Sequence, residues 1–507
     1  MAEDGRVPKV SPAADDRTPL AGSRIDIPVR IGWLLRTHRM VAGLSLREMS
    51  VELTARGVRL SSSTLSRIET EGHRSPAALD GYADVLGLPD GLLRGTIGLL
   101  CRTFRYAPPE SREQGEPGRP SLDRFSAACD AVDVPAPTGG AWMRFARAHS
   151  YTSGFGLPVR LMEPHLLRIN AELGLAVGTA MITRHEALSS LRIGPYGDLL
   201  EEVTRDEILV PGHPAVDRLF GPLSDRPTRS LLHWLNDLLR HERVELSRSA
   251  TYALQSMLLS GDLDAREWAT LVPALVEAWS DPDPGRRSAL AQLATALPPE
   301  LQREVRRSCD VDAALPAPPP DWSRSRRNRH YERARELGRA VCARLGHPEE
   351  PLLDRLVFES LFEIRGVRMA HALMLLRASA FRDAFAEVLL EELPRARDED
   401  ARTAMRRALV SMHQGRPLPE GAGLLESEDD ADFVTGVRLI GSGGGVLPDA
   451  AVERGLAGDE EARRHTVTAL GQANDPRLRA LRERAGLSRE LRDSAVWWSD
   501  RSGRILI

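Results

Sequence analysis

The sequence has 507 residues, a hydrophobic content of 42%, few aromatic residues and a formal net charge of −4. This length predicts two to four domains, and the net charge excludes a protein that coats nucleic acid along its whole length. Charged residues interrupt every apolar run well before about 18 residues, so we expect no membrane-spanning helix and a cytoplasmic location.

The first 24 residues are predicted to form a disordered arm. They are rich in Pro, Ala, Gly and charged residues and have no repeating apolar stripe. The acidic residues Glu3, Asp4, Asp15 and Asp16 balance the bases of this arm. We therefore expect a flexible leader and not a DNA contact.

Residues 25–104 are predicted to form about five short helices, because apolar residues recur there at helical spacing. The recurring positions are Ile31, Leu34, Leu35 and His38, then Leu46, Met49 and Leu53, then Leu65 and Ile68, then Leu79, Tyr82, Ala83 and Leu86. Stripes of this kind close around a single small core. Residues 25–105 hold eleven arginines and eight acidic residues, the sign expected of a segment that approaches phosphates.

The third of these helices, at about residues 62–69, opens on three consecutive serines. Serine hydroxyls can cap a helix by accepting backbone N–H bonds. If Leu65 and Ile68 point inward, the outward side carries serines beside Arg67. Small hydroxyls and a guanidinium suit the major groove of DNA, where they bond to base edges or phosphates.

Four matching segments in the right order resemble the Cro/C1-repressor (XRE-type) helix-turn-helix DNA-binding domains. They are LLRTHRMVAGLS, LREMSVEL, STLSRIE and PAALDGYADVLGL, and they cover roughly a sixth of the chain. The resemblance implies that the third helix lies in the major groove. The base-reading residues that we expect are Ser62, Ser63, Ser66 and Arg67. The phosphate contacts that we expect are Arg36, Arg39, Arg47, Arg56, Arg59, Ser61 and Arg74.

Two features depart from the family pattern. Leu46 stands where the family usually has a glutamine that contacts the DNA backbone, and the segment TARGVRL makes the turn before the third helix longer than usual. The longer turn leaves the docking register open and brings Arg56 and Arg59 forward as extra phosphate contacts. The alternative for the whole bundle is a helical module that makes only protein contacts.

After this bundle, residues 91–104 read as an amphipathic helix that packs on it or forms a dimer contact. Residues 105–121 have the Pro, Gly and charge content of a linker. Residues 122–314 and 331–507 read as the two halves of a long helical array, since nothing in them alternates with period two. The fold class that we predict is therefore all-α.

Five segments of the array share an acidic or serine start, an early arginine, and small or aliphatic residues at helical spacing. They begin at Val244, Pro282, Asp398, Asp459 and Ser488 and resemble HEAT-type repeats. The alternative is an irregular helical domain whose composition makes this pattern recur. The apolar end of the chain after Trp497 and Trp498 is predicted to fold back on the last helices, with a subunit contact as the alternative.

Two segments interrupt the array. Residues 315–330 pair a proline run with an arginine cluster, and we expect a solvated linker and helix start, with a second nucleic-acid contact as the alternative. The cluster consists of Arg324, Arg326, Arg327 and Arg329. Residues 415–433 are acidic and rich in Pro and Gly, and we expect an exposed loop.

No pattern in the sequence supports catalysis. The four cysteines form no CxxC pair, and the thirteen histidines include no HExxH. The glycine cluster at residues 441–445 lacks the spacing of a phosphate-binding loop, and we expect a flexible turn there, although VRLI before it is a candidate strand. We therefore expect no catalytic residue, no metal, no cofactor and no enzyme.

Together these features predict a bacterial sequence-specific transcriptional regulator at the nucleoid. Its partners would be double-stranded DNA, a second copy of the chain, and a peptide or protein effector on the array, because a solenoid offers an extended surface. The alternative is a helical-repeat interaction scaffold that the N-terminal bundle anchors to DNA.

Overall fold

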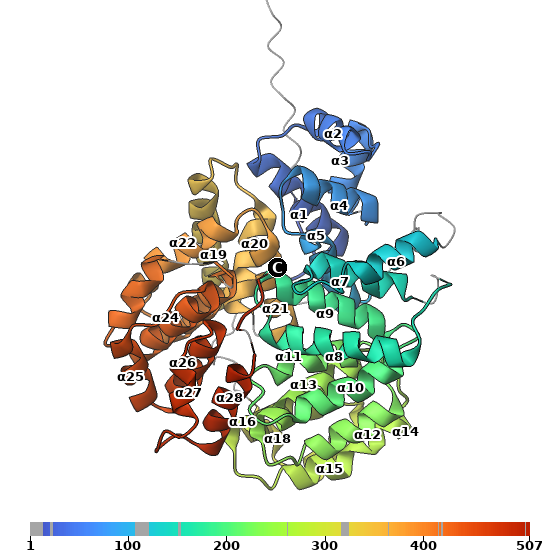
Figure 1. The fold of residues 1–507 in the computed structure, drawn as a ribbon. Coiled ribbons are helices and arrows are strands. Elements are labelled where there is room, and N and C mark those ends of the chain that lie inside the picture. Colours follow the sequence, from blue (N-terminus) through green and yellow to red (C-terminus); the bar gives the residue numbers. More distant parts are fainter. Residues whose placement is uncertain are drawn as a thin grey trace, which may run out of the picture. The chain divides into compact units, whose positions relative to one another are not determined.

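A computed structural model shows an all-α protein, as the sequence predicts (Figure 1). The structure describes residues 14–20, 24–72, 74–106, 121–150, 154–260, 262–315, 324–363, 365–413, 415–416, 419–501 and 503–506. Within these residues every regular element is a helix, and a single isolated β-bridge joins Ala176 to Ile505. Most of the predicted 105–121 linker and the proline run of residues 316–320 lie outside the described residues.

The chain forms two compact units, each assembled from three separate segments. Unit 1 comprises residues 1–88, 103–114 and 321–412, and unit 2 comprises residues 89–102, 115–320 and 413–507. The predicted second half of the array, residues 331–507, is therefore divided between the units. Its first part belongs with the N-terminal helices.

Unit 1 contains the segment that resembles the helix-turn-helix domain. Its helices are α1 (Ile27–Val41), α2 (Leu46–Ala55), α3 (Ser62–Glu71), α4 (Pro76–Val85), α19 (Arg324–Arg344), α20 (Pro351–Phe362), α21 (Gly366–Ala378), α22 (Arg382–Glu392) and α23 (Glu399–His413, except its last residue), with the 3-10 turn η1 (Leu393–Arg395). Local sequence explains the helix starts. Asp26 caps α1, and Ser45 and Glu48 cap α2 reciprocally.

Residues 14–20 are ordered parts of unit 1, so the prediction of a disordered arm is wrong for them. Asp16 is buried, and its carboxylate accepts hydrogen bonds from Arg30 of α1. A composition rich in Pro, Ala and charge did not reveal this, because the partners of Asp16 are arginines far along the chain.

Unit 2 is a stack of helices, and successive helices contribute buried apolar residues to its core. Its elements are α5 (Leu92–Thr103, except its last residue), α6 (Leu122–Asp130), α7 (Gly139–Ala148), α8 (Val159–Leu175), α9 (Thr179–Arg192), α10 (Gly197–Leu209), α11 (Val216–Ser224), α12 (Arg229–Leu238), α13 (Val244–Ser260), α14 (Ala265–Ala269), α15 (Leu271–Ala278), α16 (Pro284–Ala296), α17 (Pro299–Ser308), α18 (Val311–Ala314), η2 (Pro419–Glu426), α24 (Asp430–Gly443), α25 (Asp449–Ala457), α26 (Glu460–Gln472), α27 (Leu478–Leu481) and α28 (Arg489–Ser499). Helix α7 packs on α9, α9 on α11, α11 on α13 and α13 on α16. This order is typical of stacked helix pairs.

The five repeat-like segments each form one helix, namely α13, α16, α23, α26 and α28. Helix α13 packs on α16, and α26 packs on α28. Each shared stripe of small and aliphatic residues therefore forms a helix, and four of the five pack on one another in two pairs.

Helix α5 belongs to unit 2, although residues 25–104 were predicted to form one domain. Its glycines bring it close to α9, since a Cβ at Gly95 would lie 3.2 Å from the Ile182 side chain, and one at Gly98 would lie 2.6 Å from the Glu186 carboxyl. Arg102 also forms an ion pair with Glu186. The lack of a side chain at these glycines permits the close approach. Helix α5 therefore packs within unit 2.

Three further predictions, for residues 315–330, 415–433 and 437–440, can be compared with the structure. The predicted helix start after the proline run is confirmed, because α19 begins at Arg324. The candidate strand VRLI is wrong, because it lies in α24, and Gly444 ends that helix in the left-handed conformation. The predicted 415–433 loop contains η2, and Phe433 at its end is buried in α24.

The last residues of the chain fold back, as predicted, and contact unit 2. The amide of Ile505 donates to the Leu175 carbonyl at 3.1 Å, and its carbonyl accepts from the Val177 amide at 3.0 Å. The Arg504 amide donates to the Gln472 carbonyl at 3.2 Å, at the end of α26. The tail therefore joins the final helices to the turn between α8 and α9.

Candidate nucleic-acid interface

Helix α3 has the caps and the inward stripe that its sequence predicts. The Ser61 hydroxyl accepts from the Thr64 amide at 3.2 Å, and Gly72 ends the helix with a φ of 66°. Leu65 and Ile68 are buried. The third helix therefore starts and turns as the serine run and the apolar spacing indicated.

The opposite side of α3 is polar and open to solvent. Ser63, Arg67 and Thr70 are exposed, and Ser62 and Ser66 are half-buried. Residues 63, 67 and 70 are spaced to share one face of a helix. The structure thus brings the four predicted residues onto one helix, and Thr70, at i+3 from Arg67, lies on the same exposed face.

Four of the predicted phosphate contacts are exposed residues on α2, in the turn after it or at the N-cap of α3. Helices α2 and α3 pack side by side (Figure 1), and Arg47, Arg56 and Arg59 on α2 and the turn after it are exposed. Arg56 also pairs with Glu52 at 2.7 Å. Ser61 is exposed while its hydroxyl caps α3, and Arg74 beyond α3 is half-buried.

Arg36 and Arg39 lie elsewhere than predicted, because both are buried. Arg36 forms an ion pair with Glu350 at 2.6 Å, and Arg39 forms one with Glu69 at 2.6 Å. Eleven of the fifteen residues of α1 are buried, since α20 and its neighbours cover a second side of this helix. Arg36 and Arg39, which we expected to contact phosphates, therefore bind carboxylates inside unit 1.

Glu69 connects the candidate reading helix to the rest of the bundle. Both of its carboxylate oxygens accept from the Arg39 guanidinium at 2.6 Å, and the Tyr82 hydroxyl of α4 donates to it at 2.9 Å. Burial would lower the pKa of Arg39, but its hydrogen bonds to Glu69 raise it. We call this set the Arg39–Glu69–Tyr82 cluster; it fixes α3 against α1 and α4.

Two glycines allow the same helices to approach closely. A Cβ at Gly32 of α1 would lie 2.1 Å from the Glu69 carbonyl oxygen, so the backbones of α1 and α3 are in close contact here. A Cβ at Gly72 would lie 2.4 Å from the Pro28 carbonyl oxygen. These approaches, with the ion pairs, leave α3 little freedom to rotate.

The far side of α1 packs on α20, α21 and the residue before α22. The Trp33 ring stacks on Phe381 with centroids 5.9 Å apart, and the His38 Nε2 donates to the Ala378 carbonyl at 2.7 Å. Burial lowers the pKa of His38, which keeps the ring neutral. Arg30 donates to Glu359 of α20 at 2.7 Å and 2.8 Å. Helix α1 is therefore held between α3 and α20 within unit 1.

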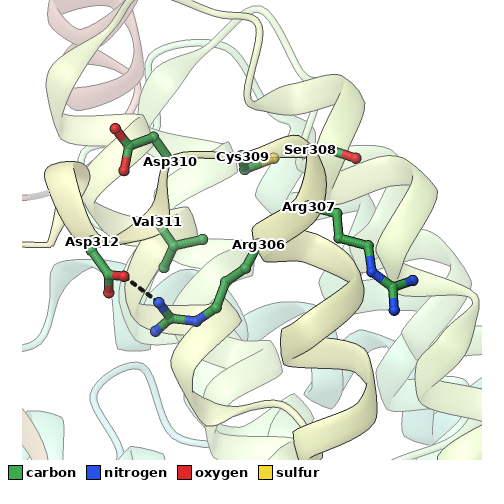
Figure 2. A pocket seen from close by; sticks show the side chains of 7 residues that line it. All are labelled: Arg306, Arg307, Ser308, Cys309, Asp310, Val311 and Asp312. Carbon is green, nitrogen blue, oxygen red and sulfur yellow. Dashed lines mark hydrogen bonds and ion pairs between the residues drawn. The ribbon is translucent and has the colours of Figure 1, made fainter.

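The described residues could form a further site through a cluster of metal-binding side chains or through a surface pocket. They hold no group of three His, Cys, Asp or Glu side chains that could bind a metal ion. A shallow surface pocket of about 350 Å³ lies at the end of α17. Figure 2 shows Arg306 directed at Asp312 there, while Arg307 points away. Burial raises the pKa of Cys309, so its thiol is a poor nucleophile.

No family model matches this chain, and no curated protein does. None of the helices in the described segments is long and apolar enough to cross a bilayer.

Proposed function

We propose that the protein is a sequence-specific DNA-binding transcriptional regulator of XRE type. In this proposal α3 enters the major groove of double-stranded DNA. Arg67 donates to a guanine edge, and Ser62, Ser63 and Ser66 bond to neighbouring bases. The single observation that carries the proposal is the polar, accessible face of α3 on a helix that the Arg39–Glu69–Tyr82 cluster holds in place.

The phosphate contacts that we propose are the exposed Arg47, Arg56, Arg59 and Ser61, together with the half-buried Arg74. Four exposed arginines lie on α2, α3 and the turn between them, against three exposed glutamates, Glu48, Glu52 and Glu71. Glu48 is engaged in the cap of α2, and Glu52 pairs with Arg56. The small excess of positive charge favours salt-dependent binding that relies on a few contacts.

We propose a homodimer, because one α3 reads only a few base pairs. Two copies related by a two-fold axis would place their reading helices about 34 Å apart, which is one turn of DNA. The long helical array would mediate this pairing and bind a peptide or protein effector. Such a regulator would act at the nucleoid in the cytoplasm.

Selection of bound sequences from a random DNA pool, followed by footprinting of the purified full chain, tests the proposal. A regulator enriches a partly palindromic sequence and protects one defined site, at least about a thousandfold more tightly than random DNA. Uniform weak protection would instead favour a helical-repeat scaffold that is only anchored to DNA. Absence of any binding at low salt would reject both.

Arg67→Ala is the test variant for that experiment, and Asp123→Ala is its control. Arg67 lies on the exposed face of α3, whereas Asp123 lies on α6 in unit 2 and is also exposed. The first change should alter the selected sequence, and the second should leave it unchanged.

A further inference from the structure

Residues 14–20 contact α20 and α21 in a regular, alternating way. Ala14, Asp16, Thr18 and Leu20 are at least partly buried, while Asp15, Arg17 and Pro19 are exposed. This period of two is typical of an extended segment with one side on a protein surface. The segment is not helical, and its inward side rests on unit 1.

The backbone carbonyls of the inward residues are bound one after another. The Leu352 amide donates to the Ala14 carbonyl at 3.2 Å, and Arg355 donates to the carbonyls of Asp16 and Thr18. Arg365 and Arg368 then donate to the Leu20 carbonyl, at 2.6 Å and 3.2 Å. Carbonyls occur in every peptide, so these contacts bind a chain without selecting its sequence.

The Asp16 side chain supplies the selectivity. One carboxylate oxygen accepts from Arg30 at 2.8 Å and 2.9 Å and from the Asp26 amide at 3.2 Å. The other accepts from the Thr18 amide at 3.0 Å and the Thr18 hydroxyl at 2.6 Å, and lies 3.2 Å from Arg355. An aspartate followed two residues later by a threonine satisfies all of these donors, and a neutral side chain would leave two buried arginines without this partner.

The arginines that receive the segment also have carboxylate partners outside it. Arg30, Arg355 and Arg368 all donate to the Glu359 carboxylate, and Arg365 pairs with Glu363 at 2.6 Å. A set of donors on α1, on α20 and at the start of α21 that nearby carboxylates already hold is the arrangement of a binding site, because little ordering remains to be done when the ligand arrives.

We infer that this face of α20 and α21 is a peptide-binding site, occupied by residues 14–20 of the same chain, whose ligand class is an extended peptide with an Asp-x-Thr sequence. This inference rests on the part of the proposed function that gives the array a peptide partner, and it does not require DNA binding. A competing peptide of this class would displace the segment and take over its contact with Arg30, and so with α1.

The first test uses a fluorescent synthetic peptide of residues 12–22 and three full-length chains. In the wild-type chain, residues 14–20 occupy the site at a millimolar effective concentration, so micromolar peptide should not bind. The double variant Asp16→Ala, Thr18→Ala should release its own segment and bind the peptide saturably. The matched control is Asp15→Ala, Arg17→Ala, which changes the exposed neighbours and should behave like the wild type.

Peptide specificity completes this test. A peptide in which Asp16 and Thr18 are replaced by alanine should bind the double variant at least about tenfold more weakly. Equal affinity for the two peptides would overturn the inference, as would the absence of binding to a double variant whose circular dichroism matches the wild type.

A second measurement uses the wild-type chain and holds even if the double variant fails to fold. Trypsin cuts after Arg17 only when the segment leaves its site, because a protease requires a locally released chain. Millimolar peptide 12–22 carrying Arg17→Gln, which trypsin cannot cut and which changes only an exposed position, should accelerate this cut several-fold, and a scrambled peptide with the same change should not. An unchanged cleavage rate would overturn the inference. Neither measurement involves DNA, so failure here is distinct from failure of the proposed DNA binding.

Discussion

The Arg39 guanidinium donates to both carboxylate oxygens of Glu69 at 2.6 Å, and both side chains are buried. This pair joins α1 to the candidate reading helix α3, and Tyr82 adds a bond from α4. Its consequences for stability can be separated residue by residue.

Arg39→Ala should destabilise unit 1 strongly, by ~3–5 kcal/mol, because it leaves the Glu69 charge buried with one hydrogen-bond partner. Tyr82→Phe should have a smaller effect of ~1.5–3 kcal/mol, since it removes one hydrogen bond to a charged group. Urea unfolding followed by circular dichroism measures both. Equal and small losses would contradict a structural role for the pair.

Gly72→Ala should destabilise far more than Gly43→Ala. Both glycines have a left-handed backbone, with φ values of 66° and 72°. A Cβ at residue 72 would also meet the Pro28 backbone at 2.4 Å, whereas one at residue 43 meets nothing within 4 Å. Gly43→Ala should therefore show only the backbone strain of about 1 kcal/mol. Similar melting temperatures for the two variants would refute the close contact at Gly72.

Arg67→Ala should weaken binding to the selected DNA sequence by ~1–3 kcal/mol and relax the preference at one base pair. The reason is that Arg67 is exposed on the face of α3 opposite the buried Leu65 and Ile68. Competition titrations with single-base variants of the site measure the effect. A variant that keeps both affinity and base preference would remove Arg67 from the reading set.

Arg47→Ala and Arg59→Ala should weaken binding to all sequences alike and reduce the salt dependence by about one counterion each. Both side chains are exposed. Arg36→Ala is the informative comparison, because the buried Arg36 pairs with Glu350 and should affect stability more than the salt slope. Binding isotherms at several salt concentrations distinguish these outcomes, and an unchanged slope for Arg47→Ala and Arg59→Ala would argue against phosphate contacts.

Glu359→Gln should reveal a pH-dependent contribution to stability. Burial alone would raise the pKa of Glu359, but Arg30, Arg368 and Arg355 lower it to about 2. A folded pKa below the ordinary value of 4.5 means that the stabilisation is present above pH 4.5 and is lost as the pH falls toward 2. The stability difference between wild type and variant should therefore shrink over that range.

Glu350→Gln provides the control of opposite sign. Burial outweighs the neighbouring Arg36 and raises the pKa of Glu350 to about 6. The wild type should then lose stability relative to this variant as the pH rises from 4.5 to 6. Denaturant unfolding at steps of half a pH unit checks both slopes, and parallel curves for the two variants would contradict the assigned shifts.

Local sequence signals predicted the local structure of α3 and little about its surroundings. Ser61 caps the helix and Leu65 and Ile68 point inward because capping and apolar spacing act within a few residues. The burial of Arg36 depends on Glu350, which lies 314 residues away, and no spacing rule connects the two. The local sequence around an arginine that another helix buries does not differ from the local sequence around an arginine that contacts a phosphate.

The same limit applies to Asp16. Its segment has the composition of a disordered arm, and its order comes from Arg355 and Arg30. Likewise, the amphipathic pattern of α5 does not indicate which helix it packs on. Its glycines, which lie close to α9, allow it to pack there. The all-α class, by contrast, follows from periodicity alone and is confirmed.

The pairing of Arg30 with Glu359 also affects how the protein is made. Their positions are 329 residues apart, so at ribosomal speeds of roughly 5–20 residues per second the arginine emerges about 15–65 s before its carboxylate exists. During that interval Arg36 stays hydrated, because Glu350 has not been made, and Arg30 has only the Asp16 carboxylate as an ion-pair partner. A gene fragment that encodes only the first hundred residues would keep them in that state permanently.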